Sequence, residues 1–425
     1  MSDSVKEKVF TIIDNSCNEL AELTSELVKF PSLMGDENAI QRFVAERLQA
    51  DGAEQVDLWY PDIDEMRKHP AFCSSRTSFD GSPNVVGTFC GSGGGRSIIL
   101  NGHVDVVPAG EGWDSSPWSG EIKDNRVWGR GSGDMKGGLA ANIMAVEAIR
   151  KAGIRLKGDV QIHSVVDEEV GGMGTLATIV RGYRADGVII PECTSMKIIN
   201  TTIGSTWVRL TIHGKAALLA CADQGVSAIG KAMYIYEKLI DFKKERTVRL
   251  AHPKLSHFAT PFEINVGKLT AGIWPSSIPD LAVMEIRYGM SPNETVEDAK
   301  AEFEAYIEAI CNEDSWLHNN RPELEWLGTC WQAFSSDENS ELIQHTKANF
   351  EMVRNETTEV TGMACATDGP LYARYLGIPF VLIGAGGMLE AHQVNESISI
   401  PDNVDVCKII AATILDWCGY EMEMM

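Results

Sequence analysis

Two polar clusters flanked by glycines carry residue types that bind metals. His103 and Asp105 follow a short apolar run, which is typical of a buried strand that ends just before them. Side chains two apart on an extended chain point the same way, so His103 can bind a metal while Asp105 braces its ring. Asp134 lies between a glycine-rich turn and a helical pattern. A capping Asp beside a surface His is the usual explanation of a lone H-x-D, but the full spacing favours a site for a pair of metal ions.

Three further clusters of acids or histidine follow apolar runs later in the chain. They contain the triplet Asp167-Glu168-Glu169, then Glu192, then His392. Ligands of open α/β sheets bind where strands end, so these positions favour one common site. A solvated acidic turn is the commoner fate of such a triplet, but this one lies between an apolar strand and Gly-Gly. Two imidazoles and several carboxylates are a suitable ligand set for zinc, manganese or cobalt.

The segments that would position these residues alternate between helix and strand. Helical spacing of apolar residues predicts helices over 5–28, 37–49, 136–149, 174–181, 340–350, 371–375 and 404–417. Short apolar runs predict strands over 84–89, 98–100, 160–166, 187–190 and 379–383. This alternation predicts an α/β fold in which a mixed sheet is covered by helices. Residues 60–83 show no period and are expected to form an irregular surface segment.

The pattern changes from Thr202 onward and predicts a second, smaller domain. Strands are expected over 206–212, 262–266 and 281–287, and helices over 227–242 and 296–310. This order is that of a small α+β domain of the ferredoxin-like type. We therefore expect a catalytic domain formed by 1–205 and 321–425, with a lid or dimerisation domain inserted at 206–320.

Composition excludes several classes of function. The chain of 425 residues is 44% hydrophobic and 23% charged, as soluble globular proteins are, and its net charge is -23. Such an acidic chain without a basic block is not expected to bind nucleic acid or an anionic membrane. There is no transmembrane pattern and no signal-peptide pattern at the start, and the ten cysteines form no C-x-x-C pair. We expect a cytoplasmic protein with reduced cysteines.

Five motifs resemble, in order and spacing, those of a family of co-catalytic zinc peptidases and deacylases. They read GHVDVVP, GRGSGDMKGG, DEEVGG, PECT and AHQVNE. The family includes aminoacylase, acetylornithine deacetylase, succinyl-diaminopimelate desuccinylase and glutamate carboxypeptidase, and the resemblance covers almost the whole chain. The long N-terminal segment with HPAF is most similar to the acetylornithine deacetylase-like and deformylase-like branch.

The resemblance implies two divalent metal ions, zinc above all, with cobalt or manganese as alternatives. It implies that Asp134 bridges both ions, that His103 and Glu192 hold one or the other, and that Glu169 and His392 complete the two shells. It also implies a cis peptide bond after Asp134.

Two metals about 3.5 to 4 Å apart can share a water, lower its pKa and polarise a scissile carbonyl. Glu168 would take the proton of this water and pass it to the leaving nitrogen, while Asp105 orients His103. The products are a carboxylate and an amine.

The sequence departs from the family pattern at the residues expected near the substrate. Leu218 stands where relatives have a His that donates a hydrogen bond to the oxyanion, and the nearby His213 is too far along its strand to replace it. Arg287 matches a family Arg that binds a substrate carboxylate, although an ordinary strand Arg paired with an acid is an equal alternative. Asp368 matches a substrate-side loop, in which Pro370 stands where relatives commonly have Arg.

These observations lead to one main hypothesis and two alternatives. The main one is a dinuclear-metal amidohydrolase that cleaves a small N-acyl substrate, such as an N-acylated amino acid, by deacylation, deacetylation or deformylation. A dipeptidase or carboxypeptidase is the alternative among enzymes. A catalytically impaired small-molecule-binding homologue is the other alternative, and Leu218 motivates it. The resemblance also implies a homodimer formed through the inserted domain.

Overall fold

The computed structural model describes residues 2–422 of the chain. The helices are α1 (Ser2–Asn15), α2 (Cys17–Val28), α3 (Asn38–Ala50), α4 (Ile63–Met66), α5 (Gly137–Lys151), α6 (Met173–Arg181), α7 (Ala228–Arg249), α8 (Val296–Glu313), α9 (Glu341–Arg354), α10 (Gly369–Leu376) and α11 (Ile400–Cys418). None of these described helices is long and apolar enough to cross a membrane.

The strands belong to two large and two small sheets. They are β1 (Gln55–Trp59), β2 (Asn84–Phe89), β3 (Ile98–His103), β4 (Glu121–Lys123), β5 (Arg126–Trp128), β6 (Ile154–Leu156), β7 (Val160–Val165), β8 (Val188–Ile190), β9 (Ile198–Thr202), β10 (Gly204–His213), β11 (Ile264–Ala271), β12 (Leu281–Met290), β13 (Glu323–Trp331), β14 (Phe334–Ser335), β15 (Val360–Met363), β16 (Phe380–Leu382), β17 (Ser397–Ser399) and β18 (Tyr420–Met422).

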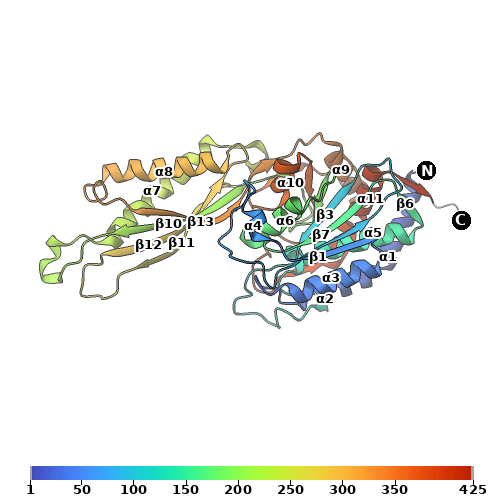
Figure 1. Cartoon of the computed structure of the whole chain (residues 1–425), viewed down its shortest axis with the longest axis horizontal. Coiled ribbons are helices and arrows are strands. Elements are labelled where there is room, and N and C mark those ends of the chain that lie inside the picture. The colour runs from blue at the N-terminus through green and yellow to red at the C-terminus, as the bar shows by residue number, and fades with distance from the viewer. Residues whose placement is uncertain (1, 423–425) are drawn as a thin grey trace.

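The larger part of the molecule is built on a mixed sheet. Its strand order is β1-β2-β7-β3-β8-β16-β9-β14, and β15 pairs with β9. The neighbours β7, β3, β8 and β16 are parallel, whereas β1, β2 and β14 pair antiparallel to their neighbours. Helices flank this sheet, with α5 beside α11 and α6 beside α10 (Figure 1). The expected α/β fold with a mixed, helix-covered sheet is confirmed.

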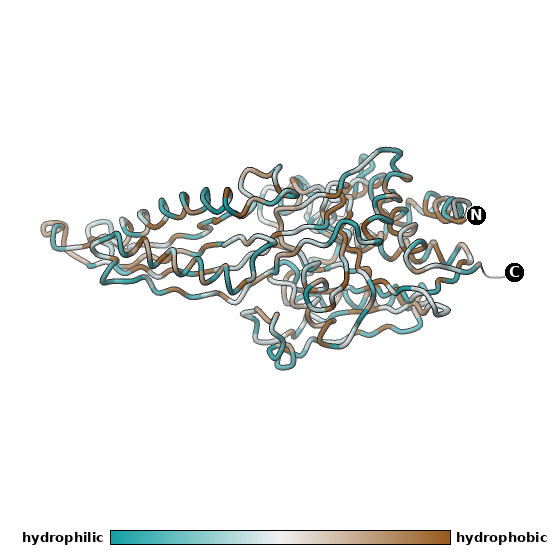
Figure 2. The backbone as a smooth tube through the Cα atoms, turned by 90° about the horizontal axis from the view of Figure 1, so that it is seen from above, coloured by the Kyte–Doolittle hydropathy of each residue, from teal (hydrophilic) through white to brown (hydrophobic). Residues whose placement is uncertain are grey.

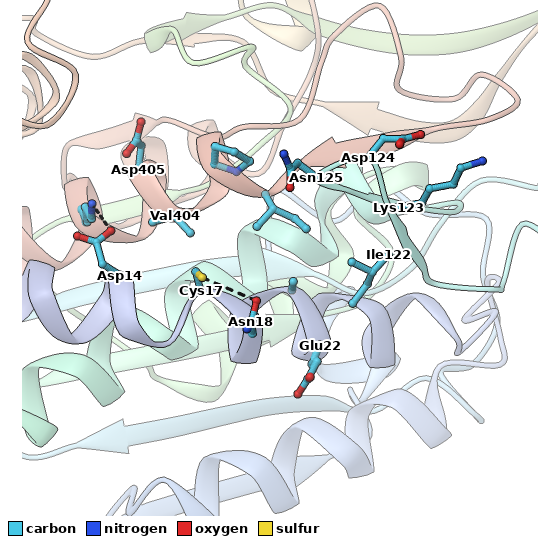
Figure 3. Close-up of a pocket in the computed structure, with 14 residues that line it drawn as sticks. Asp14, Cys17, Asn18, Glu22, Ile122, Lys123, Asp124, Asn125, Val404 and Asp405 are labelled. Atoms are coloured by element: carbon cyan, nitrogen blue, oxygen red, sulfur yellow. Dashed lines mark hydrogen bonds and ion pairs between the residues drawn. The ribbon is translucent and has the colours of Figure 1, made fainter.

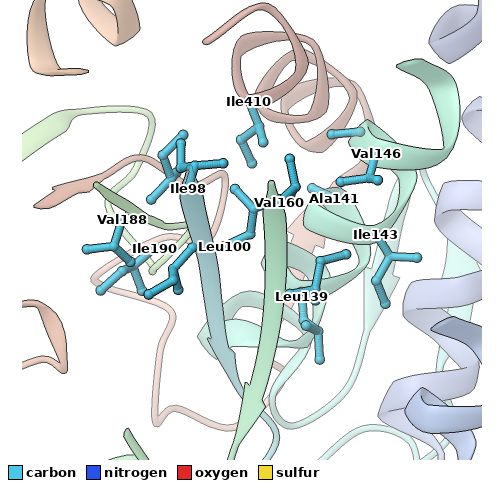
Figure 4. Close-up of a cluster of buried hydrophobic side chains, with 14 of the residues drawn as sticks. Ile98, Leu100, Leu139, Ala141, Ile143, Val146, Val160, Val188, Ile190 and Ile410 are labelled. Atoms are coloured by element: carbon cyan, nitrogen blue, oxygen red, sulfur yellow. The ribbon is translucent and has the colours of Figure 1, made fainter. Parts of the chain in front are cut away.

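The core of this part lies between the parallel strands and helices α5 and α11. Ile98 and Leu100 of β3 are fully buried among side chains of β7, β8, α5 and α11 (Figure 4). Because strands in the middle of a parallel sheet are covered on both faces, they read as continuous apolar runs, and the β3 and β8 runs do so. This packing fixes the carboxyl ends of these strands relative to one another.

The smaller part is a four-stranded antiparallel sheet with strand order β11-β12-β10-β13. It forms an arm that extends from the body of the molecule, with α7 and α8 along one side (Figures 1 and 2). Val208, Leu210 and Ile212 alternate along β10 and are buried in a separate core with side chains of both helices. The element order β-α-β-β-α-β extends the predicted order by β13, which lies beyond residue 320. We propose that the inserted domain, called the lid below, runs from about 204 to 331.

Several expected elements differ in detail from those observed. The helix expected over 5–28 is two helices, because Ser16 has φ -103° and ψ 16° and interrupts it. The strand expected over 262–266 is β11, which extends to Ala271. Residues 60–83 are mostly irregular, as expected, but they include α4, and several of their side chains are buried, Phe79 among them.

Candidate metal centre

The predicted ligands meet at the carboxyl edge of the large sheet. Parallel pairing places His103, the last residue of β3, opposite Val165, the last residue of β7. The acidic triplet follows β7 after one valine, and Glu192 follows β8 after one proline. Strands that run in one direction end at the same edge, which brings loops from distant parts of the chain together.

Asp134 lies between the two imidazoles of this cluster. Its Oδ1 is 3.2 Å from Nε2 of His103, and its Oδ2 is 3.4 Å from Nε2 of His392. Nε2 of His392 is also 3.1 Å from Oε1 of Glu169, and Nε2 of His103 is 4.0 Å from Oε1 of Glu192. A carboxylate with one oxygen facing each imidazole has the arrangement of a bridging ligand. The Asp134–Met135 peptide bond is cis, as the resemblance implied.

The electrostatics of the cluster fit a positively charged occupant. Burial raises the pKa of Glu192 to about 8, and the charge of Asp134 adds to this effect. Burial likewise raises the pKa values of Glu168 and Glu169. Several carboxylates removed from water require compensating positive charge, which a divalent cation supplies. The ligand atoms of His103, Asp134 and Glu169 all lie within 4.8 Å of one another, so one ion can reach all three.

Cys193 is a further donor beside the cluster that the sequence analysis did not single out. Its thiol is 3.6 Å from Oδ2 of Asp134, and Asp134, Glu192 and Cys193 form a second group whose ligand atoms lie within 4.8 Å of one another. The sequence signal was its place in the PECT motif, directly after Glu192.

Asp105 has a different set of contacts from the one expected. Nδ1 of His103 is 2.9 Å from the backbone carbonyl of Asp105 but 3.6 Å from its Oδ1, so the ring donates to the carbonyl. The Asp105 carboxylate instead accepts from the backbone N–H of Glu168 at 3.2 Å and of Glu169 at 3.1 Å. Asp105 therefore orients His103 through its main chain and the acidic triplet through its side chain.

A buried ion pair that the sequence analysis missed supports the Asp134 loop. Arg130 donates to Oε2 of Glu396 at 2.7 Å, and Oε1 of Glu396 accepts from the backbone N–H groups of Gly133 and Asp134. Arg130 also donates to the carbonyl of His392 at 3.3 Å. Both residues are almost fully buried. The sequence held one indication of this pair, because Arg130 belongs to the motif GRGSGDMKGG and Glu396 to the motif AHQVNE.

A cavity of about 700 Å³ opens over the cluster, and residues of both parts of the molecule line it. Glu168, Glu169 and His392 form its metal side, while Trp207 and Arg287 of the lid form the opposite wall. Trp207 and Arg287 are directly paired across β10 and β12, so they lie on one face of the smaller sheet. Among residues 2–422 no acid forms an ion pair with Arg287, and burial lowers its pKa. Its guanidinium is thus available to a ligand.

A second hollow of about 760 Å³ lies between α1, α2, the β4–β5 turn and the start of α11 (Figure 3). Its lining includes acids and lysines, two of which form the Lys408–Asp14 ion pair of 2.6 Å. It contains no imidazole, and none of the groups of potential metal ligands found in residues 2–422 lies there. The groups of potential metal ligands found in residues 2–422 thus lie around Asp134 and not in this second hollow.

Two other predicted substrate residues lie outside this cavity. Asp368 is buried, and its Oδ2 accepts from Thr175 at 2.7 Å and from Asn101 at 3.3 Å. Leu218 is 68% exposed on the loop after β10, where it pairs with Ser277 of the connection between β11 and β12. Neither residue touches the metal cluster within this one chain.

Comparison with known proteins gives the relatives of this chain. An N-formyl-4-amino-5-aminomethyl-2-methylpyrimidine deformylase from Bacillus subtilis is 33% identical over 367 residues, which cover 81% of this chain and 85% of that protein. A protein of the same name from Halalkalibacterium halodurans is 30% identical and covers 98% of both chains.

The similarity of folds extends to solved structures of low sequence identity. The dipeptidase Dug1p from Saccharomyces cerevisiae has a TM-score of 0.77 at 17% identity, covering 98% of this chain and 99% of that one. YXEP from Bacillus subtilis, described as a dinuclear metal-binding peptidase of the M20 family, has a TM-score of 0.61 at 16% identity, covering 95% of this chain and 99% of that one.

The family profile gives the broadest assignment. The profile of peptidase family M20/M25/M40 matches residues 99–416, which include all five motifs. The expected relation to zinc peptidases and deacylases and the expected class of metal-dependent amide hydrolase are thereby confirmed. The chain belongs to peptidase family M20/M25/M40.

Proposed function

We propose that the chain removes a formyl or other short acyl group from a small amine, with the deformylase-type reaction as the first candidate. The observation that carries the proposal is the placement of Asp134 between two imidazoles, one of which, His392, lines a cavity together with Glu168. The two curated relatives named as deformylases support the acyl group. We therefore expect the amine to be a small heteroaromatic aminomethyl compound or an amino acid.

We propose that the centre holds two divalent ions, zinc in the first place, with cobalt or manganese as alternatives. His103, Glu192, Asp134, Glu169 and His392 would hold them. Bound there, the ions would acidify a water and polarise the amide carbonyl.

The remaining roles belong to residues of the chain. Glu168 would accept the proton of the attacking water and donate it to the leaving nitrogen, and a raised pKa suits an acid that must do both near neutral pH. Trp331 fixes Glu168 by donating from Nε1 to its backbone carbonyl at 2.9 Å. Arg287 would hold an acidic or electron-rich group of the substrate from the lid side. Asp368 would support the cluster from behind the acidic triplet rather than touch the substrate.

The test begins with protein stripped of metal and reloaded with zinc or with cobalt. Release of amine is then measured from N-formyl aminomethylpyrimidine and from N-formyl, N-acetyl and N-carbamoyl amino acids, with dipeptides as the alternative class. Metal-dependent release from a formyl or acetyl substrate supports the proposal. Release from dipeptides alone favours the peptidase alternative, and binding without turnover of any compound favours the impaired homologue.

The position of Leu218 bears on how the chain assembles. Leu218, Leu219, Ile273 and Trp274 are exposed apolar side chains at the far end of the lid. We propose that a second copy of the chain packs against the lid, as the expected homodimer requires. Sedimentation at several concentrations tests this, and a monomer throughout the range would reject it. We also propose a cytoplasmic location, which the ten free cysteines support.

A further inference from the structure

The segment from Phe72 to Ser82, called the strap below, lies against the loop that carries the acid–base residue. This loop, residues 167–172, is called the acidic loop. A Cβ added to Gly171 would be 3.3 Å from the carbonyl oxygen of Cys73 and 3.7 Å from the backbone nitrogen of Cys330. The acidic loop is therefore enclosed between the strap and the end of β13, where the lid joins the body. The lack of sequence period in the strap gave no sign of this contact.

Arg76 provides the polar contact between the strap and the acidic loop. Its Nη1 donates to Oδ1 of Asp167 at 2.8 Å, and its Nη2 donates to Oγ of Ser82 at 2.7 Å. Its Nε donates to the carbonyl of Ser78 at 3.2 Å, and the guanidinium lies 4.3 Å from the centre of the Phe79 ring. Three donors and a stacking face are thus engaged, which holds the side chain in one position.

Arg76 also balances the negative charge of buried carboxylates, above all that of Asp167. Asp167 and Glu37 are both fully buried. Arg76 contacts Asp167 directly and Glu37 through Ser82, whose hydroxyl accepts from Arg76 and donates to Oε2 of Glu37 at 2.7 Å. Oδ2 of Asp167 and Oε1 of Glu37 have no hydrogen-bond partner. Within residues 2–422 the contact with Arg76 is the one ion pair that Asp167 makes. Removing Arg76 would leave the buried Asp167 carboxylate without its ion-pair partner, and an unpaired buried charge favours movement of the segment that carries it.

Asp167 transmits this constraint directly to the residues of the proposed reaction. It immediately precedes Glu168 and Glu169, and its own φ of +67° lies in the left-handed region that most residues other than glycine avoid. Its carbonyl accepts from the backbone N–H of Gly172 at 2.8 Å, which closes the acidic loop. We propose that Arg76 is a positioning residue that fixes Glu168 and Glu169 by holding Asp167. This inference rests on the proposed function of Glu168 and Glu169.

The test compares Arg76→Met and Arg76→Lys with a matched control. Arg354→Met is the control because it also removes an arginine that joins two segments of the large domain: Arg354 of α9 forms partly exposed ion pairs with Asp402 at 2.7 Å and Asp405 at 2.8 Å in α11. We expect Arg76→Met to lower kcat by roughly 10- to 100-fold, as loss of outer contacts of a metal ligand does. KM should change by less than about threefold, because Arg76 does not line the cavity. Arg76→Lys should recover part of kcat, since an ammonium can reach Asp167 but cannot bind Ser82 as well.

Two further measurements separate this inference from the proposed function. Amide hydrogen exchange of the acidic loop in metal-free protein should be faster in Arg76→Met than in Arg354→Met, and it needs no substrate. The double variant Arg76→Met/Asp167→Asn should exchange no faster than Arg76→Met, because the two residues act through one contact. If no substrate is hydrolysed by the wild-type protein but exchange of the acidic loop is faster in Arg76→Met, the proposed function is rejected and the role of Arg76 stands. The role of Arg76 would be overturned if the acidic loop exchanged at the wild-type rate in both Arg76→Met and Arg76→Lys. It would also be overturned if the Arg354→Met control lost as much kcat as Arg76→Met.

Discussion

The Asp105 carboxylate supports a specific prediction because its two oxygens have separate tasks. Oδ1 accepts from the N–H of Glu168 and Oδ2 from the N–H of Glu169, while the carbonyl alone holds His103. We compare Asp105→Asn with Asp105→Ala. Both variants remove the charge and thus relieve its repulsion of Glu37 equally. Asparagine keeps one acceptor oxygen, whereas alanine keeps none.

The difference between the two variants then measures one hydrogen bond to a backbone N–H in a buried site. Such a group left unpaired costs about 1 to 3 kcal/mol, which corresponds to roughly a 5- to 150-fold change in an opening equilibrium. We therefore expect amide exchange at residues 168–169 in metal-free protein to be faster by that factor in Asp105→Ala than in Asp105→Asn. The wild-type protein should exchange more slowly than both.

Metal binding provides the second half of this test. Cobalt titration should show weaker binding in both variants, by roughly 10- to 100-fold, because Glu169 loses its fixed position. Equal exchange in wild type, Asp105→Asn and Asp105→Ala would refute the reasoning. It would mean that the triplet is held by Arg76 and Trp331 alone and that the carboxylate of Asp105 is dispensable.

Three other predictions follow from the same structure. Glu168→Ala should retain two cobalt ions per chain and lose turnover, whereas Glu169→Ala should lose an ion; the reverse result would show that the two roles are exchanged. Leu218→His should raise the rate at least tenfold if a second subunit brings this loop to the cavity, since an oxyanion donor contributes about 2.7 to 4 kcal/mol to stabilising the transition state. An equal rate in a proven dimer would show that another group is the donor. Burial lowers the pKa of His163 from 6.5 to about 3. As the pH falls below 6.5, His163 therefore takes up a proton in the unfolded chain but stays neutral in the folded one. The stability that this residue contributes is complete above pH 6.5 and should fall by about 2 kcal/mol between pH 7 and pH 5, and His163→Gln should remove that part of the pH dependence in denaturant titrations.

The metal cluster was predictable because its residues occupy strand ends that the apolar runs define. His103, Glu192 and the acidic triplet each lie within three residues of the end of such a run, and parallel strands bring their ends to one edge. Asp134 and His392 come from longer connections, and their places beside a glycine-rich turn and after an apolar run gained weight from the order of the five motifs. His163 belongs to none of the five motifs, and it is a buried histidine of the core whose ring nitrogens contact Tyr372 and Gln161.

The supporting residues could not be predicted, because each depends on a contact between distant segments. The carboxylate of Asp105 was expected at the ring of His103, but the amides of the acidic triplet are nearer to it. Arg130 and Glu396 pair across 266 positions of sequence. Arg76 lies in a segment with no helical or strand period, and nothing in local sequence distinguishes a buried arginine from an exposed one.

The place of β16 in the large sheet has a consequence for how the protein is made. It lies between β8 and β9, although the whole lid is synthesised after β9 and before β16. At about 5 to 20 residues per second, a ribosome needs on the order of ten seconds for the lid alone. During this interval the nascent sheet has a gap in its centre, and His392 has not yet been added. The polypeptide acquires the full set of proposed metal ligands only near the end of translation, so the proposed metal centre forms late in its biogenesis.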